Sequence, residues 1–164
     1  MFKQILLNNI EKEINICCRL STKINPAQLS FTPKESLRSI LDILQYLSHI
    51  GADMPKYWLN GVTDFNAFFK EVAIAAKSIT LENFIAAMNR QKEEINQLFA
   101  GLSDDDLLNK QIDYPWGSSA SLGEAIVATS IKWLAAYKLQ LFLLIKMSGD
   151  EPLGTADAWM LTDL

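Results

Sequence analysis

Apolar residues recur at helical spacing through most of this chain, and this pattern limits what it can fold into. Near the N-terminus they occupy every fourth position, at Phe2, Leu6, Ile10, Ile14 and Cys18. An α-helix turns once in about 3.6 residues, so this spacing places all of them on one face. The same spacing returns in later segments, and no stretch of four or more residues favours a strand over a helix. The sequence therefore predicts an all-α protein.

Turn and capping residues divide this pattern into predicted helices. The second helix has the clearest start, because Thr32 and Glu35 are spaced as a capping box with a proline between them. Gly51 is expected to end that helix. A second capping box, Ser121 with Glu124, starts the last helix. The predicted helices cover residues 2–22, 33–51, 64–78, 81–101 and 121–148, and segments 52–61 and 111–120 are expected to be loops.

Four long amphipathic helices with short to medium connections are typical of an antiparallel bundle. The chain has 164 residues, of which 49% are hydrophobic and 21% charged, so it can bury one sizeable core without a disulfide or metal. We expect a single domain over residues 1–164. The tail after Gly149 is predicted to be loop-like, with Trp159, Met160 and Leu161 docked on the bundle.

The net charge and the number of cysteines indicate which cellular location and which classes of partner to expect. The formal net charge is −4, which argues against nucleic-acid binding, since such proteins carry a basic face. Charged residues come too early for a secretory signal. The only two cysteines, Cys17 and Cys18, are adjacent on one helix and poorly oriented to bridge, so we interpret them as small core residues. These features predict a cytoplasmic protein.

The most apolar segment, residues 125–147, is long enough to raise the question of a membrane. Lys132, Lys138 and Lys146 interrupt it, and lysines near the middle of a span are costly in hydrocarbon. We therefore expect a core helix and no membrane contact. Because the helix is apolar on more than one face, we also expect a homodimer that forms through it. The second apolar face contains Ile131, Leu134, Leu139, Phe142 and Leu143.

Two segments carry a more specific pattern. Residues 33–51 read PKESLRSILDILQYLSHIG, and residues 113–146 contain Pro-Trp-Gly at 115–117 and Ser-Leu-Gly-Glu at 121–124. Together with the helix order, these segments resemble the DinB-like superfamily, which includes YfiT-type metal-dependent hydrolases. The resemblance implies a four-helix up-down-down-up bundle, and here it would carry one additional short helix.

The resemblance also implies a divalent metal held by three histidines, one on the second helix and two spaced by four residues on the last. Alignment on Gln140 places Trp133 and Tyr137 at the last-helix positions and Tyr46 at the remaining one. The chain has a single histidine, His49, so no register supplies three imidazoles. We therefore predict no metal site of this type and no cofactor.

A weak divalent metal site made of a single histidine and carboxylates remains possible from the sequence. Asp42 and His49 lie seven residues apart on the second helix, on the same side as Tyr46, and Glu71 and Glu124 are further carboxylate candidates. The alternative is that His49 simply lies near a helix C-terminus, where a positive ring is modestly favourable.

The aromatic replacements have two interpretations. Tyr46, Trp133 and Tyr137 either fill the space left by the ion, since cores avoid cavities, or line a retained cleft for a small apolar or amphipathic molecule. Gln140 would then add a polar contact. The candidate ligand-binding residues are Tyr46, His49, Asp42, Trp133, Tyr137 and Gln140.

Three functions remain open from the sequence. The first is a small-molecule-binding or interaction module without the metal chemistry of the superfamily. The second is an enzyme, a hydrolase or thiol-dependent transferase with a degenerate or non-histidine site, in which Tyr46, Tyr137, His49 or Asp42 would act as acid or base. The third is a structural partner that assembles through the last helix.

Overall fold

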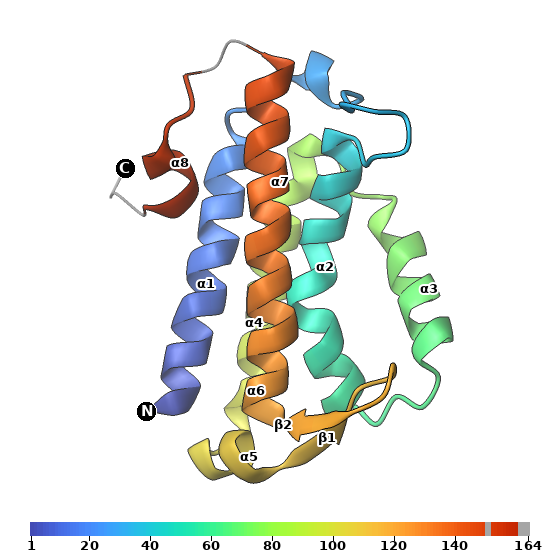
Figure 1. The fold of residues 1–164 in the computed structure, drawn as a ribbon, viewed down its shortest axis with the longest axis vertical. Coiled ribbons are helices and arrows are strands. Elements are labelled where there is room, and N and C mark those ends of the chain that lie inside the picture. Colours follow the sequence, from blue (N-terminus) through green and yellow to red (C-terminus); the bar gives the residue numbers. More distant parts are fainter. Residues whose placement is uncertain (150–151, 161–164) are drawn as a thin grey trace.

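The computed structural model describes residues 1–149 and 152–160, and its framework is a bundle of four long helices (Figure 1). Helices α1 and α7 run in one direction, and α2 and α4 run in the other. Helix α2 packs between α4 and α7, and α1 contacts the same two helices. The predicted all-α, up-down-down-up bundle is therefore confirmed. The four helices are α1 (Phe2–Ser21), α2 (Ile40–Leu59), α4 (Leu81–Ala100) and a final helix made of α6 (Leu122–Ile126), a π-helical turn (Val127–Ile131) and α7 (Lys132–Ser148).

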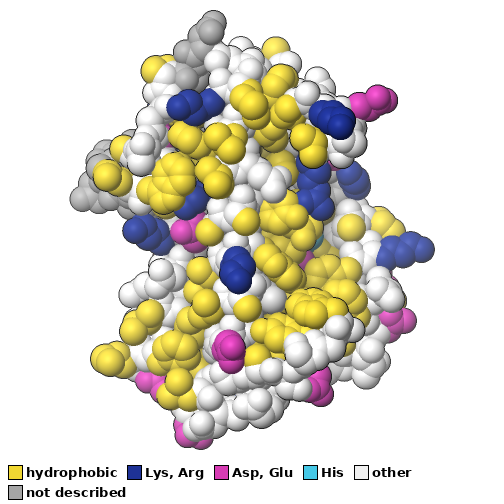
Figure 2. Space-filling view, viewed as in Figure 1, with side chains coloured by type: hydrophobic (Ala, Val, Ile, Leu, Met, Phe, Trp, Pro, Cys, Tyr) yellow, Lys and Arg dark blue, Asp and Glu magenta, His cyan; other side chains and the backbone are white. Residues whose placement is uncertain are grey.

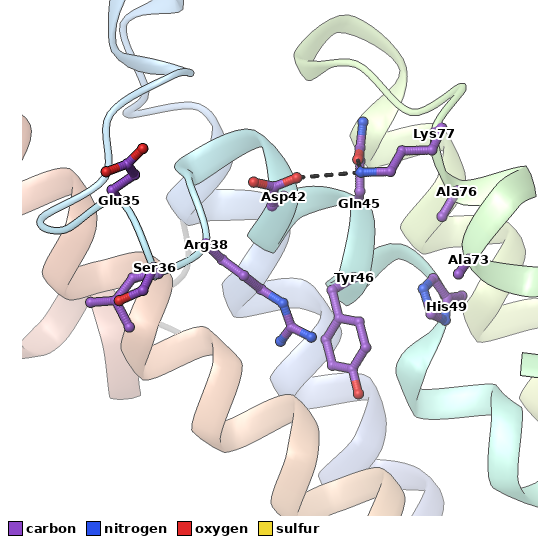
Figure 3. A pocket seen from close by; sticks show the side chains of 11 residues that line it. Glu35, Ser36, Arg38, Asp42, Gln45, Tyr46, His49, Ala73, Ala76 and Lys77 are labelled. Atoms are coloured by element: carbon purple, nitrogen blue, oxygen red, sulfur yellow. Dashed lines mark hydrogen bonds and ion pairs between the residues drawn. The ribbon is translucent and has the colours of Figure 1, made fainter. Parts of the chain in front are cut away.

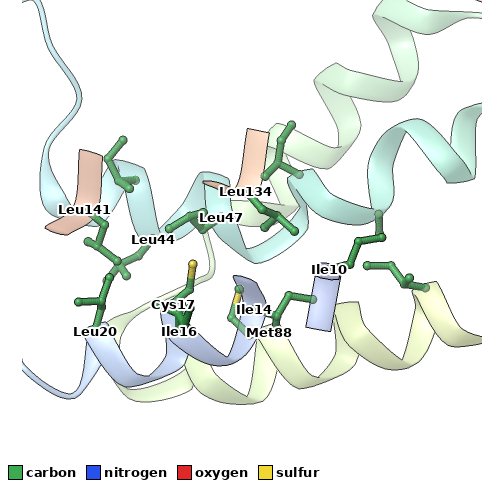
Figure 4. Packing of buried hydrophobic residues seen from close by; sticks show 14 of the residues in the cluster. Ile10, Ile14, Ile16, Cys17, Leu20, Leu44, Leu47, Met88, Leu134 and Leu141 are labelled. Carbon is green, nitrogen blue, oxygen red and sulfur yellow. The ribbon is translucent and has the colours of Figure 1, made fainter. Parts of the chain in front are cut away.

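The core is built from the apolar stripes of these helices, which meet along the bundle axis (Figure 4). The stripe predicted for the first helix is largely buried, and Ile14 has no exposed surface. Burial of such aliphatic side chains supplies the main driving force for folding. The residues drawn at the centre of the core include Ile10, Ile14, Leu20, Leu44, Leu47, Met88, Leu134 and Leu141.

The start of α2 differs from the prediction. Thr32 caps no helix, because its hydroxyl donates to the carbonyls of Lys34 and Leu37 and holds this segment in turns. The helix begins instead at Ile40, with Ser39 and Asp42 forming a reciprocal capping box. Residues 33–38, which were expected to be helical, therefore lie outside the helix, and several of them line a pocket at the bundle surface.

The predicted stop at Gly51 is also wrong, since α2 continues through the expected loop to Leu59. Gly51 serves packing instead. A Cβ placed there would come within 2.8 Å of both the Gln91 Oε1 atom and a methyl group of Leu134. The glycine that was expected to end the helix thus allows α4 and α7 to approach α2 closely.

The segment expected as a loop contains a short antiparallel hairpin, β1 (Gln111–Asp113) and β2 (Ser119–Ser121). Ile112 pairs with Ala120, and both side chains are buried. Gly117 and Ser118 turn the chain with φ angles of +95° and +69°. Three-residue strands are too short to show a period-two pattern in the sequence.

Short helices complete the fold. The short helix predicted over 64–78 is α3 (Phe65–Ala76), which packs on α2 beside the bundle (Figure 1). Helix α5 (Asp104–Asn109) precedes the hairpin, and a 3₁₀ turn (Pro26–Gln28) follows α1.

The tail forms α8 (Thr155–Trp159), whose Trp159 packs on Phe142, while Arg19 donates to the Met160 carbonyl. Leu161 lies outside the described residues.

The last long helix, Leu122–Ser148, is long and apolar enough by length and composition to cross a membrane, and 39% of its most apolar window is buried inside the bundle. In its middle, the Lys138 ammonium is buried and lies 2.6 Å from a carboxylate oxygen of Glu13 on α1. This intramolecular ion pair accounts for a charge in an otherwise apolar helix.

Candidate functional site

A pocket of about 380 Å³ lies between α2, α3 and the segment that precedes α2 (Figure 3). The turns before Ile40 bring Arg38 to one side of the pocket, and α3 supplies the opposite wall with two alanines. Small side chains on α3 leave room that larger ones would fill. The lining residues are Glu35, Ser36, Leu37, Arg38, Asp42, Gln45, Tyr46, His49, Ala73, Ala76 and Lys77.

Two tyrosines and one arginine form the most distinctive part of the site. The rings of Tyr46 on α2 and Tyr137 on α7 meet edge to face, with centroids 4.4 Å apart. The Arg38 guanidinium carbon lies 4.2 Å from the Tyr46 ring centroid and 5.0 Å from that of Tyr137. A cation over aromatic faces is held electrostatically while its N–H groups stay available. Within the described part of the chain, Arg38 has no carboxylate partner.

The Tyr46 hydroxyl is a weak acid in this setting. Burial raises its pKa to about 12, and the neighbouring Tyr137 adds to the rise, while Arg38 opposes it. The phenol therefore stays neutral at physiological pH. It can donate a hydrogen bond, but it does not ionise to act as a base.

The other cation of the pocket is already paired. The Lys77 ammonium lies 3.4 Å from Asp42 Oδ1 and 3.1 Å from Gln45 Oε1. Asp42 also accepts from Ser39 in the capping box, and this bond, more than Lys77, lowers the pKa of its carboxyl. Arg38 is thus the cation of this pocket that lacks a paired acid among the described residues.

His49 has a partner that sequence reasoning missed. Its Nδ1 atom lies 2.5 Å from Oδ2 of Asp53, one helical turn further along α2. Asp53 has no exposed surface, and burial raises the pKa of its carboxyl although the hydrogen bond from His49 opposes the rise. The available signal was the four-residue spacing of an acid and a histidine on one helix, which places the two side chains on one face.

The structure separates the candidate residues into groups. Asp42, Tyr46 and His49 line the pocket together, and Tyr137 touches Tyr46 beneath Arg38. Gln140 lines a different, mainly apolar hollow of about 220 Å³, which Arg38 also borders. Trp133 packs near Trp116 on the hairpin, with ring centroids 6.3 Å apart. Figure 2 shows many hydrophobic side chains on the face that includes α7 and the hairpin.

The residues at this position do not fit a divalent cation. Tyr46 of the pocket wall and the adjacent Tyr137 lie under a guanidinium, whose positive charge repels a metal ion, and the Tyr46 phenol keeps its proton. Glu71 and Glu124 are exposed on other elements. Among residues 1–149 and 152–160, no group of three histidine, cysteine or acidic side chains is placed to hold a metal.

Cys17 lies in the core, as interpreted from the sequence, whereas Cys18 is only partly buried and packs against it. Cys17 is fully buried, and burial raises the pKa of its thiol far above the usual value. Burial also raises the pKa of Cys18 to about 11. Neither thiol is primed to ionise, so neither has the character of a nucleophile.

Comparisons with known proteins bear on the fold. No protein-family model matches the sequence, and no curated protein matches it. Among solved structures, the chain is similar to the mycothiol-dependent maleylpyruvate isomerase, with a TM-score of 0.53 and 9% sequence identity. The alignment covers 91% of this chain but 61% of the isomerase chain, so this chain spans less than two thirds of that protein. The likeness shows that this chain has an all-α, DinB-like fold.

Proposed function

We propose that this protein is a binding module for a small amphipathic carboxylate, held in the pocket between α2 and α3. The observation that carries the proposal is the Arg38 guanidinium, which lies over Tyr46 and Tyr137 without an acid partner in the described chain. Its planar fork matches the two oxygens of a carboxylate. The Tyr46 side chain, together with Ala73 and Ala76 on α3, offers the apolar contact that an amphipathic ligand needs.

Further features of the pocket support this assignment. Its volume of about 380 Å³ suits a molecule the size of a substituted benzene ring. Lys77 is occupied by Asp42 and Gln45, so it adds positive potential but no free donor fork. The neutral Tyr46 hydroxyl is available as a hydrogen-bond donor.

The test is titration calorimetry with phenylacetate and benzoate, and with phenylethanol as a neutral analogue of similar shape. We expect the carboxylates to bind and phenylethanol to bind at least about tenfold more weakly, because it cannot form the charged fork. Arg38→Gln should reduce carboxylate affinity by a similar factor. Lys34→Gln is the matched control, since Lys34 is an exposed cation of the same segment that does not line the pocket.

Two results would reject the proposal. One is equal affinity for the acids and the alcohol, which would show that charge plays no part. The other is unchanged phenylacetate affinity in Arg38→Gln, which would place binding elsewhere. Elemental analysis of the purified protein adds an independent check, because stoichiometric zinc or nickel would contradict the poor fit of this site to a metal.

An enzymatic function, such as a thiol-dependent transferase or isomerase, is the second candidate, and the similarity to the mycothiol-dependent isomerase in fold is what favours it. Here the Tyr46 hydroxyl would serve as an acid and not as a base, since its pKa is raised to about 12. Turnover of maleylpyruvate with a small thiol that survives a chelator and is lost in Tyr46→Phe would favour catalysis. Absence of turnover alongside phenylacetate binding would favour the binding module.

A further inference from the structure

A second pocket, of about 320 Å³, lies between α2, α3 and α4, on the other side of His49. His49 lines both pockets, but Arg38 and Tyr46 do not reach this one. Its walls are polar toward α2 and α4 and apolar toward α3, where Val72 and two alanines face the space, together with Ile79 beyond α3. The two pockets therefore have different chemistry.

Asp53 contributes an unsatisfied acid to this second pocket. One of its oxygens is bonded to His49, while the other, Oδ1, is buried and has no hydrogen-bond partner among the described residues. The residue has no exposed surface. A buried carboxylate oxygen without a donor is costly, so a ligand N–H group that reaches Oδ1 as the pocket wall shifts would offset that cost.

Arg90 contributes a cation without a partner. Arg90 lines the same pocket from α4, and its side chain forms no ion pair with an acid within residues 1–149 and 152–160. The remaining charges of the pocket wall, Lys56 and Glu94, form an ion pair with each other. The Asp53 Oδ1 atom and the Arg90 side chain are thus the two polar groups of this pocket that lack a partner among the described residues.

We propose that this second pocket binds an α-amino acid with an apolar side chain. The ammonium group would donate to Asp53, and the carboxylate would lie on the Arg90 fork. The side chain would rest on Val72 and Ile79, which supply the apolar part of the lining. The inference is independent of the carboxylate pocket, because it uses different residues on the far side of His49.

Three ligands that share one aliphatic chain test the proposal: L-leucine, isoamylamine and isocaproate. L-leucine carries both charges, isoamylamine carries the ammonium alone, and isocaproate carries the carboxylate alone. Titrations use wild-type protein and the Arg38→Gln variant, which lacks the fork of the other pocket. We expect L-leucine to bind saturably in both proteins, and each single-charge analogue to bind at least about tenfold more weakly in Arg38→Gln.

Two variants assign the contacts to particular residues. Introduced into the Arg38→Gln protein, in which the other pocket has lost its fork, Arg90→Gln should weaken L-leucine and isocaproate at least about tenfold but leave isoamylamine unchanged. Asp53→Asn should weaken L-leucine and isoamylamine but not isocaproate, and circular dichroism checks that this buried substitution folds. Glu93→Gln, an exposed change on α4 outside the pocket, is the control. Absence of saturable L-leucine binding, or unchanged L-leucine affinity in Arg90→Gln, would overturn the proposal. Arg90 is exposed, so this second result does not depend on a variant of the core.

Discussion

The side-chain amide of Gln91 is hydrogen-bonded to the backbone of Gly51, across the interface between α4 and α2. Its Oε1 accepts from the Gly51 N–H at 2.6 Å, and its Nε2 donates to the Leu47 carbonyl at 2.9 Å. Gln91 is almost fully buried, and the missing side chain of Gly51 leaves the space that the amide occupies. One buried side chain thus fixes the register of the two helices on which the second pocket is built.

Replacing Gln91 by Ala should destabilise the fold by about 1–3 kcal/mol, because the variant loses two buried hydrogen bonds and leaves a void. Urea denaturation followed by circular dichroism measures the change. Gln97→Ala is the matched control, since Gln97 is exposed on the same helix, and it should change stability by less than about 0.5 kcal/mol. Equal effects of the two substitutions would show that the buried amide has no special role.

Replacing Gly51 by Ala tests the same contact from the other side. The added methyl group would lie within 2.8 Å of Gln91 and Leu134, which both pack from neighbouring helices. We expect a loss of about 1–3 kcal/mol by overpacking, although alanine has the higher helix propensity. Gly101→Ala has open space around it and is the control. A variant Gly51→Ala that is more stable than wild type would contradict the close approach.

The difference between prediction and structure follows the range of the interactions involved. Helices bounded by local signals were predicted well, such as α4, which starts after Thr80 and ends before Gly101. The C-terminal end of α2 was not predicted, because the packing role of Gly51 depends on Gln91, a residue 40 positions away. Sequence spacing says nothing about such a partner. A single sequence does not distinguish a glycine that ends a helix from one that allows two helices to pack closely. The start of α2 was missed for a local reason, since Ser39 and Asp42 form its capping box.

The candidate site shows the same division. The superfamily alignment placed Tyr46 and Tyr137 at corresponding positions, and the structure brings their rings together. Arg38 was not selected, because the segment before α2 was expected to be helical and not to turn across the tyrosines. Asp53 was missed because its significance comes from burial, which composition does not reveal.

The N-terminus of α1 predicts a specific response to acid. The Asp104 carboxylate accepts from the backbone N–H groups of Lys3 and Phe2 and pairs with the Met1 amino group. The Lys3 N–H bond, followed by the amino group and the Phe2 N–H, lowers the pKa of Asp104 from 3.8 to about 2. Its stabilising effect is therefore complete above the unfolded pKa and is lost as the pH falls through about 2.

We expect Asp104→Asn to unfold at lower urea concentration than wild type at neutral pH, and the difference to shrink as the pH falls from 3.8 toward about 2. Asp105→Asn controls for the loss of a charge in the first turn of α5, because Asp105 accepts its hydrogen bond from Asn109 within α5. A difference that stays constant across this pH range would exclude the ionised carboxylate as its source.

The buried ion pair between Glu13 and Lys138 predicts an asymmetry between its two partners. The Lys138 side chain is 3% exposed and that of Glu13 is 16% exposed. Glu13→Gln leaves the deeper charge uncompensated and should cost on the order of 3 kcal/mol in urea denaturation, more than Lys138→Met. Glu11 lies on α1 like Glu13, and Glu11→Gln breaks its more exposed pair with Lys92 on α4, so it should cost less than about 1 kcal/mol. A smaller loss for Glu13→Gln than for Lys138→Met would contradict this reasoning.

The outer face of α7 is where we expect the homodimer to form, and this can be tested directly. Leu139, Leu143 and Met147 are each exposed and spaced four residues apart, so they form one apolar stripe on α7, whereas Leu134 and Phe142 of the expected apolar face are buried. We predict that light scattering shows a dimer and that Leu143→Glu converts it to a monomer, because burying a carboxylate in the interface is unfavourable. Ile74→Glu is the control, since Ile74 is exposed on α3, away from this stripe. A wild-type protein that stays monomeric at high micromolar concentration would rule out this dimer.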